Sequence, residues 1–381
     1  MGQYTLTKIN VIREIAGVFL KLGTISFGGP VAHIAMMEKE IVQKRNWVSE
    51  QHFLDLIGAT NLIPGPNSTE MAIHIGHERA GWKGLIVAGL CFIIPAVIIT
   101  GIFAVLYKKY GQLPQLQPFM YGIKPTIIAI ILAAIYPLGK KSLKSVELGV
   151  LGVIALLLCL IGVNEIYVMF GAGLIALTYA AIRNNKVSLG NSIFPFTILK
   201  LPATGFLSIS NLSLFFTFLK IGAILYGSGY VLFAFLDTAL VEKGIISRQQ
   251  LIDAIAVGQF TPGPVFSSVT FIGYQINGFT GAIVSTLGIF LPSFVFVALL
   301  NPLVKKMRNS ILFSAFLDAV NVASIAIIVA ICLQMSKDTI SDWRTVFIAI
   351  ASLLLTFGFR KINTVFIILG GSLTGYLFTL I

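Results

Sequence analysis

Long apolar runs alternate with short polar or glycine- and proline-rich breaks along the whole chain. A helix needs about 20 mainly apolar residues to cross the hydrocarbon core of a bilayer. By this measure the first half predicts spanning helices at about 9–27, 84–107, 118–138, 146–161 and 166–182. The stretches 52–62 and 67–80 are shorter and more polar, and we expect them to form a broken or re-entrant helix pair. The fold class is therefore all-α, in a polytopic membrane protein.

One break has an unusual sequence and occurs twice. Pro64-Gly65-Pro66 lies between two apolar runs, and Pro262-Gly263-Pro264 lies between two others in the second half. Pro-Gly-Pro cannot continue a helix, because two of its residues lack an N–H and the third adds backbone freedom. Proline suits the first turn of a new helix, so each break is expected to open a half-helix. The free N–H groups at such an end favour anions.

The second half repeats the first. The corresponding positions are Lys21 and Lys220, Phe27-Gly28-Gly29 and Tyr226-Gly227-Ser228, Ser49 and Ser247, Asp55 and Asp253, Gly76 and Gly273, Gly81 and Gly278, Gly84 and Gly281, and Pro95 and Pro292. We divide the chain into repeats 1–183 and 211–381, joined by a connector at 184–210. Five full spans plus one broken pair in each half give about ten spans in total. An odd number per half predicts inverted-topology repeats, with a binding site where the halves meet.

The composition supports this class and excludes others. Of 381 residues, 56% are hydrophobic and 11% charged, with a mean hydropathy of +0.92. The net charge of +12 reflects mainly the excess of Lys and Arg in cytoplasmic loops, and attraction of an anionic substrate second. The scattered basic residues argue against nucleic-acid binding. The three cysteines lack metal-ligand spacing and no nucleotide-binding fingerprint is present, so we expect no metal and no cofactor.

The candidate anion-binding residues lie at and around the two breaks. Lys21 and Lys220 occur inside apolar helices, where a lysine either extends its amine to the membrane surface or anchors an anion. Their recurrence favours the second interpretation. An ionised oxyanion offers only acceptors, so it needs converging N–H and O–H donors. The full candidate set is Lys21, Gly28, Gly29, Asn61, Pro64, Gly65, Pro66, Asn67, Ser68, Thr69, Lys220, Gln259, Gly263, Ser267 and Ser268.

Four residues are candidates for proton coupling. Glu70 and His74 are spaced i, i+4 on one helical face, which would allow proton exchange, although a simple polar contact is an equal alternative. Asp55 and Asp253 occupy matching positions, where a carboxylate near a helix start also interacts favourably with the helix dipole. Lys124, which precedes Pro125, is a weaker candidate for contact with the anion.

The motifs of the first half resemble those of the chromate ion transporter family. The residues that carry the resemblance are 27–30 (Phe-Gly-Gly-Pro), 47–49 (Trp-Val-Ser), 64–70 (Pro-Gly-Pro-Asn-Ser-Thr-Glu), 72–76 (Ala-Ile-His-Ile-Gly), 80–82 (Ala-Gly-Trp) and 89–95. The likeness covers nearly the whole chain as two fused domains. The second half departs from it, since Tyr226-Gly227-Ser228-Gly229 replaces Phe-Gly-Gly-Pro, so the halves are expected to contribute unequally to a site.

The resemblance implies transport of chromate, with sulfate as its analogue, by efflux driven by the proton-motive force. From the sequence we expect a secondary transporter with alternating access, not an enzyme, in the inner or plasma membrane. Two alternatives within transport are an importer of sulfate or another anion and an anion channel. A membrane-embedded enzyme that uses Glu70, His74 and Asp55 is a distant alternative. The expected partners are the oxyanion, protons and lipid; whether the chain forms a homodimer is left open.

Overall fold

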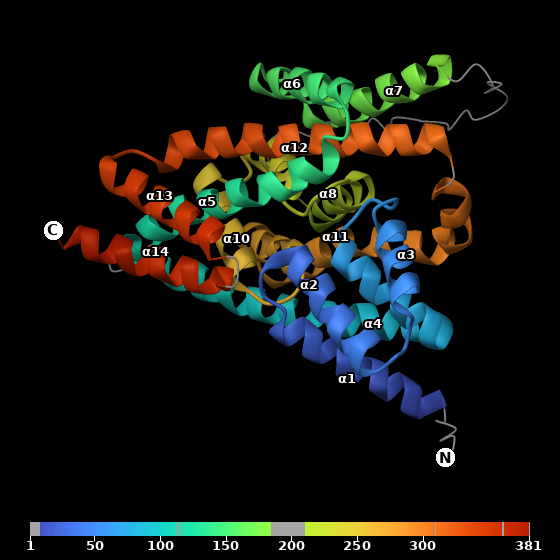
Figure 1. Ribbon diagram of the computed structural model, residues 1–381. Helices are drawn as coiled ribbons and strands as arrows, with labels where there is room; N and C mark the ends of the chain where they lie inside the picture. The colour runs from blue at the N-terminus through green and yellow to red at the C-terminus, as the bar shows by residue number, and fades with distance from the viewer. Residues whose placement is uncertain are drawn as a thin grey trace.

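The described part of the chain is helical throughout and contains no strand. The computed structural model describes residues 8–111, 113, 116–183, 210–308, 310–359 and 362–380 (Figure 1). The first half contains α1 (Lys8–Ile25), α2 (Gly29–Met37), α3 (Glu50–Thr60), α4 (Asn67–Tyr110), α5 (Gln117–Ser142), α6 (Val146–Leu160) and α7 (Glu165–Arg183). The second contains α8 (Asn211–Ile224), α9 (Val231–Leu236), α10 (Arg248–Phe260), α11 (Ser268–Arg308), α12 (Ile311–Thr339), α13 (Trp343–Gly358) and α14 (Thr364–Thr379).

The same element order runs through both halves, which confirms the two-repeat organisation. Each short helix after the glycine break, α2 or α9, continues into a π-helical segment, η1 (Glu38–Lys44) or η2 (Asp237–Val241). A 3₁₀ turn, η3 (Val265–Ser267), precedes α11. The caps follow local chemistry: the Ser49 hydroxyl accepts from the His52 N–H, as expected, and Ser247 does the same for Gln250. The connector 184–210 lies outside the described residues except for Ser210, which caps α8.

Five helices in the described part are long and apolar enough to cross a membrane: α4, α5, α7, the stretch Val265–Leu299 and α12. Four of the five spans predicted in the first half fall on α4, α5, α6 and α7, and the fifth falls on α1. The shorter apolar helices include α6, α8, α13 and α14. These five helices are identified as candidate spans by their length and composition only. The total of about ten spans therefore stays a prediction.

Both α4 and α11 are helical hairpins: each consists of two helices joined at a non-helical pair of residues, Ala80–Gly81 in α4 and Asn277–Gly278 in α11. Gly81 has φ 58° and Gly278 has φ 62°, a left-handed conformation that glycine adopts easily. A Cβ at Gly84 would collide with the carbonyl oxygen of Gly76. Residues eight apart in a straight helix are about 12 Å apart along the axis. The chain therefore turns back at Gly81, and the predicted short segment 67–80 packs against the longer segment that follows it.

The equivalent long segments of the two hairpins run in opposite directions. Across the interface between α4 and α11, Thr100 bonds to Ser267, and further along both helices the Ala104 carbonyl accepts from Gln275. These two contacts make the segment 82–110 parallel to the segment 268–276. Because α11 then turns back at Gly278, its longer segment is antiparallel to its counterpart in α4. This is the geometry that inverted repeats require.

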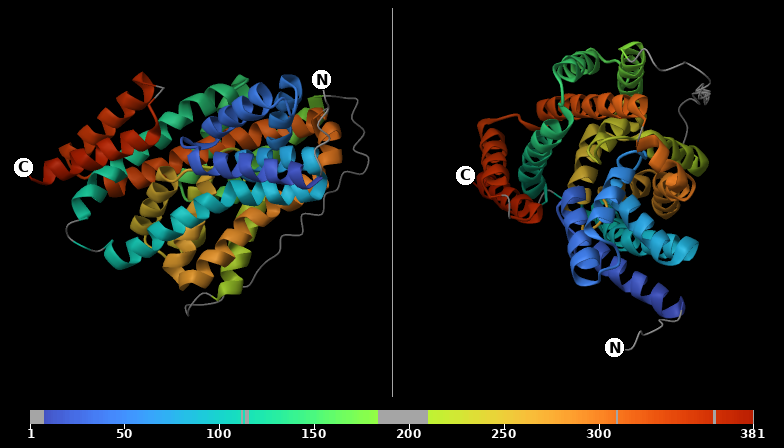
Figure 2. Two further views of the ribbon diagram at one scale, coloured as in Figure 1. Left: turned by 90° about the horizontal axis from the view of Figure 1, so that it is seen from below. Right: turned by 45° about the vertical axis from the view of Figure 1, so that its right-hand side comes forward.

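The last two helices of each half pack on the other half. The α6–α7 pair lies along α12, and the α13–α14 pair lies along α5 (Figures 1 and 2). The right-hand view of Figure 2 shows both arrangements, with the green pair over the orange helix and the red pair beside the teal one. The repeats are therefore interlocked rather than merely side by side.

Candidate functional site

The two Pro-Gly-Pro breaks bind reciprocally to opposite halves. The Gly65 N–H donates to the Leu225 carbonyl at the end of α8, and the Gly263 N–H donates to the Ser26 carbonyl after α1, each at 2.8 Å. Ser26 and Leu225 precede the matching residues Phe27 and Tyr226 in their repeats. Each break therefore lies at the interface of the two halves, where it forms one of two equivalent hydrogen bonds.

The surroundings of the two break glycines differ. Gly65 has φ 137°, and a Cβ there would collide with the Glu70 carboxylate and would lie 2.7 Å from Ser293 Oγ. Gly263 has φ 83°, and a Cβ there would lie 2.9 Å from the Ala96 methyl group. Ala96 and Ser293 follow the matching prolines Pro95 and Pro292. The first break is therefore polar where the second is apolar.

Buried polar atoms without a hydrogen-bond partner concentrate around these breaks. Among the described residues they include Ser26 Oγ, His33 Nε2, Thr69 Oγ1, both Glu70 oxygens, both His74 nitrogens, Gln259 Nε2, Ser268 Oγ and Ser293 Oγ. Most buried polar groups in proteins are paired, so each exception calls for an explanation. A polar ligand or water at the repeat interface would supply the partners that these atoms need.

Several predicted binding residues are engaged with one another. Asn67 Nδ2 donates to Asn61 Oδ1 at 2.8 Å, and Asn61 Nδ2 donates to the Ile57 carbonyl. Ser68 Oγ lies 3.2 Å from His33 Nδ1, deep in the protein. These contacts hold the polypeptide on both sides of the first break. By contrast, Thr69 and Ser268 keep unpartnered hydroxyls.

The Gly28-Gly29 break brings the two halves together a second time. Gly28 and Gly29 have φ 101° and 77°, and α2 begins at Gly29 with Pro30 in its first turn. A Cβ at Gly29 would lie 3.8 Å from the Tyr230 hydroxyl of the second half. Tyr230 also neighbours the side chain of Gln259. Gly29 and Gln259, predicted from different repeats, are thereby linked through one tyrosine.

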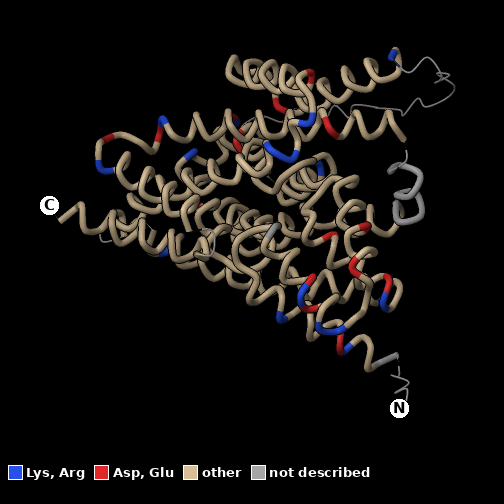
Figure 3. Tube along the Cα trace, viewed as in Figure 1, with Lys and Arg blue, Asp and Glu red and all other residues tan. Residues whose placement is uncertain are grey.

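The two predicted lysine anchors lie on the outside of the protein in this conformation. Lys21 Nζ is 3.3 Å from Glu40 Oε2, and its side chain is 49% exposed. Glu40 also pairs with Lys44 and Arg45. Charged residues of both signs gather near the N-terminus in Figure 3. Lys220 is likewise exposed on α8. Direct contact of either amine with an anion at the breaks stays a prediction.

The candidates for proton coupling have three different environments. Glu70 and His74 are fully buried, but they are not bonded to each other; Glu70 neighbours Ser293 and Tyr226 instead. Asp253 accepts from the Tyr107 hydroxyl at 2.5 Å and faces Lys124 Nζ at 3.7 Å. Asp55 is half-buried on α3. The matching aspartates therefore do not have equivalent surroundings.

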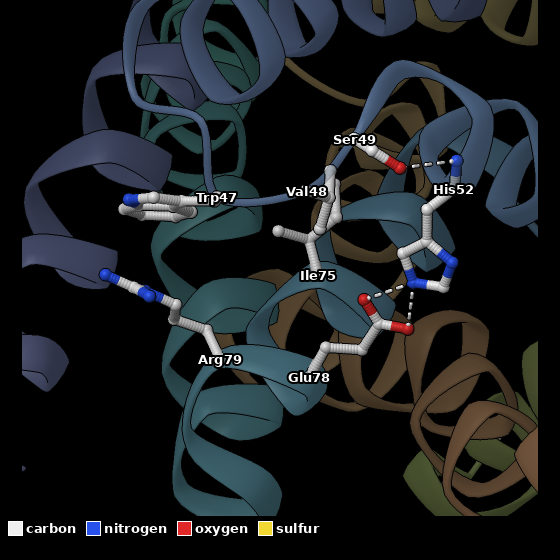
Figure 4. Close-up of a pocket in the computed structure, with 7 residues that line it drawn as sticks. All are labelled: Trp47, Val48, Ser49, His52, Ile75, Glu78 and Arg79. Atoms are coloured by element: carbon white, nitrogen blue, oxygen red, sulfur yellow. Dashed lines mark hydrogen bonds and ion pairs between the residues drawn. The ribbon is translucent and has the colours of Figure 1, made fainter.

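A separate pocket of about 330 Å³ opens beside Trp47 (Figure 4). His52 Nε2 lies 2.7 Å from Glu78 Oε1 across it, and the Arg79 guanidinium stacks 5.2 Å from the Trp47 ring centroid. Its lining residues are Trp47, Val48, Ser49, His52, Ile75, Glu78 and Arg79. None of the predicted anion ligands lines it, so it is distinct from the breaks.

Three residues near the breaks were not predicted from the sequence: Tyr226, Tyr230 and Ser293. A signal for them exists in the repeat. Each replaces an apolar residue of the first half (Phe27, Val31 and Ala96) with a hydroxyl-bearing one. Among the described residues, no group of three or more His, Cys, Asp or Glu side chains could hold a metal ion.

Comparison with known proteins agrees with this doubled architecture. The sequence profile described as "Chromate transporter" matches residues 13–177 and again residues 212–376. The chain belongs to the chromate transporter family. A chromate transport protein of Cupriavidus metallidurans is 31% identical over 96% of this chain and 92% of its own length. One from Pseudomonas aeruginosa is 27% identical over 94% of this chain and 90% of its own length.

Half-length relatives also exist. The uncharacterized transporter YwrB of Bacillus subtilis is 28% identical over 44% of this chain and 84% of its own length. A match of that extent corresponds to one repeat. No solved structure matches this chain. Family membership and the apolar helices make it a multi-pass membrane protein of an ion-transporting family.

Proposed function

We propose that this member of the chromate transporter family is a secondary transporter that exports a tetrahedral dianion by alternating access. Chromate is the expected substrate, with sulfate as its analogue, because relatives that align over almost the whole chain are named chromate transport proteins. The observation that carries the proposal is the concentration of unpartnered buried donors around two reciprocally bonded helix breaks. We expect the protein in the plasma or inner membrane.

The chemistry of the breaks suits an oxyanion. Thr69 and Ser268 offer hydroxyl donors without protein partners, Ser293 offers a third hydroxyl beside Glu70, and α4 begins directly after Pro66. A tetrahedral oxyanion accepts hydrogen bonds from such donors and is favoured at a helix N-terminus. The donors come from both halves, so a small relative movement of the halves would change the site. That is what alternating access at a repeat interface requires.

Glu70 limits how an anion binds there. Its carboxyl group is fully buried beside Gly65 and Ser293, and no cation pairs with it among the described residues. A buried carboxylate without a partner is costly, and a second negative charge beside it would add repulsion. We therefore propose that Glu70 is protonated when the dianion is bound, so that one proton accompanies it.

The membrane potential favours export even if one proton leaves with the dianion. Moving one elementary charge across a membrane is worth about 2.3 kcal/mol per 100 mV. A dianion with one proton carries a net charge of −1 outward, which a negative cell interior favours. The electrical part of the proton-motive force would then drive export.

Flux measurements in proteoliposomes test the function. Labelled chromate or sulfate loaded inside should leave faster when the interior is made negative with a potassium diffusion potential, and the rate should saturate with concentration. Absence of flux for both ions overturns the proposal. Flux that never saturates favours a channel, and net uptake against the imposed potential favours an importer.

A further inference from the structure

A buried ion pair joins the two halves away from the breaks. Lys124 on α5 faces Asp253 on α10 with 3.7 Å between Nζ and Oδ1, and their side chains are 16% and 4% exposed. Tyr107 on α4 donates to Asp253 Oδ2, and Gln249 donates to Oδ1 at 3.4 Å. An ionisable side chain inside a helix that is long and apolar enough to span a membrane is costly and usually functional.

The pair lies in line with the second break. Two contacts join α10 to α4 on this side of the break. Phe260 contacts Phe103 edge to face, with ring centroids 5.9 Å apart, and Asp253, further from the break, is bonded to Tyr107. On α5, Ile130 belongs to the apolar cluster against which Phe260 packs, while Lys124 faces Asp253. Asp253 precedes Phe260 by seven residues, or about 10 Å of helix. Two phenylalanine rings therefore separate the ion pair from Pro262-Gly263-Pro264.

A purely structural role fits this pair poorly. The residue of the second half that corresponds to Lys124 is Asn321, by the same spacing that relates Pro95 to Pro292. The lysine therefore occurs in one half only. Buried ion pairs commonly recover little more than their desolvation cost. At 3.7 Å the pair is also longer than the usual 2.7–2.9 Å of a charge-assisted hydrogen bond. Asp253 also accepts from the Tyr107 hydroxyl at 2.5 Å and from Gln249 at 3.4 Å, so it would keep hydrogen-bond partners if Lys124 bound another anion.

We propose that Lys124 forms a second oxyanion subsite, away from the breaks. Asp253 is its counter-ion in the absence of substrate, and the substrate displaces it. This inference rests on the proposed function and specifies a second station for the same anion. The substrate oxygens would replace the Asp253 carboxylate at Nζ, while Tyr107 keeps its hydrogen bond to Asp253. The phenylalanine pair Phe103 and Phe260 would then separate this station from the break.

Opposite effects of two neutral variants test the proposal. Lys124→Gln should weaken chromate and sulfate binding about tenfold or more, because the cation is lost. Asp253→Asn should strengthen it several-fold, because the competing carboxylate is gone. The measurement is equilibrium binding of labelled anion to the purified full-length protein, with thermal unfolding as a check on folding. Lys124→Arg, which keeps the charge, should bind within about threefold of the wild type.

The surface pair Lys144 and Asp318, 2.7 Å apart, supplies matched controls. Lys144→Gln and Asp318→Asn should leave binding unchanged. If Asp253→Asn weakens binding as Lys124→Gln does, the pair is structural and the subsite is wrong, while the transport function stands. If Lys124→Gln does not fold, an unchanged or weaker affinity of Asp253→Asn still overturns the subsite. A wild-type protein that binds neither anion overturns both proposals.

Discussion

Glu70 shows how much one side chain depends on the opposite half of the protein. It follows Pro64-Gly65-Pro66 in sequence, and its carboxyl group lies against Gly65 and Ser293 with no exposed surface. The i, i+4 spacing with His74 predicted a shared helical face, yet the two side chains are not bonded to each other. Ser293 comes from a helix more than 200 residues away. Sequence spacing reveals neighbours along a helix, whereas this neighbour is set by tertiary packing.

Glu70→Gln should separate transport from the proton gradient. The amide keeps the size of the carboxyl group and its neutral state, so anion binding should persist, but no proton can be gained or lost. We expect wild-type export to speed up when the compartment that holds the anion is acidified, and the variant to be unaffected. Efflux from proteoliposomes at fixed membrane potential and varied pH measures this.

Glu78→Gln is the matched control, because Glu78 is partly exposed and pairs with His52 instead. It should keep the wild-type response to acid. A Glu70→Gln protein that still responds fully to pH would remove Glu70 from proton coupling.

At the scale of single elements, the glycines of the sequence repeat decide the fold. Gly76, Gly81 and Gly84 recur as Gly273, Gly278 and Gly281, and the structure places them at the turn and contact of two equivalent helical hairpins. The sequence predicted the short segment 67–80 from its polarity, and the glycine at 81 is where the structure ends it. It could not predict which helix each segment would pack against, because an apolar face does not identify its partner. The charged residues illustrate the same limit: Lys21 pairs with Glu40, a contact that no periodicity indicated.

Gly76→Ala should loosen the first hairpin. A Cβ at Gly76 would collide with the backbone carbonyl of Gly84 and with the Ala88 methyl group, and neither can move without shifting a helix. Overpacking of this kind typically costs about 1–3 kcal/mol. We expect a lower unfolding temperature in detergent.

Gly101→Ala, in the second segment of the same hairpin, is the control, because a Cβ there has no neighbour within 4 Å. Alanine is favoured over glycine inside a helix by roughly 0.5–1 kcal/mol, so this variant should be as stable as the wild type or more so. Equal unfolding temperatures for the two variants would mean that the Gly76–Gly84 contact is not close.

At the scale of the whole molecule, the two halves exchange their last helix pairs. The boundaries at 183 and 211 stay a prediction. An isolated first half would leave α5 without α13 and α14, and an isolated second half would leave α12 without α6 and α7. The contacts are close: Gly122 on α5 lies against the backbone of Gly371 on α14, and Gly173 on α7 lies against Phe316 on α12. The hydrophobic pattern of the sequence predicts where these helices are. It does not indicate that the last pair of each half packs on the other half.

This exchange predicts that the halves fold only together. Residues 1–183 and 211–381, produced as separate chains in one cell, should co-purify as a stable complex that binds labelled chromate, because the reciprocal bonds at Gly65 and Gly263 and the exchanged pairs need no covalent connector. Each half alone should aggregate or be degraded, since it exposes the small-residue surface that the missing pair would cover. Gel filtration in detergent distinguishes these results. As a control, a cut between Leu160 and Glu165, inside the exchanged pair, should lower the yield of the complex. Stable, monodisperse separate halves would show that the exchanged contacts are not needed for folding, and the interlocked arrangement would then be wrong.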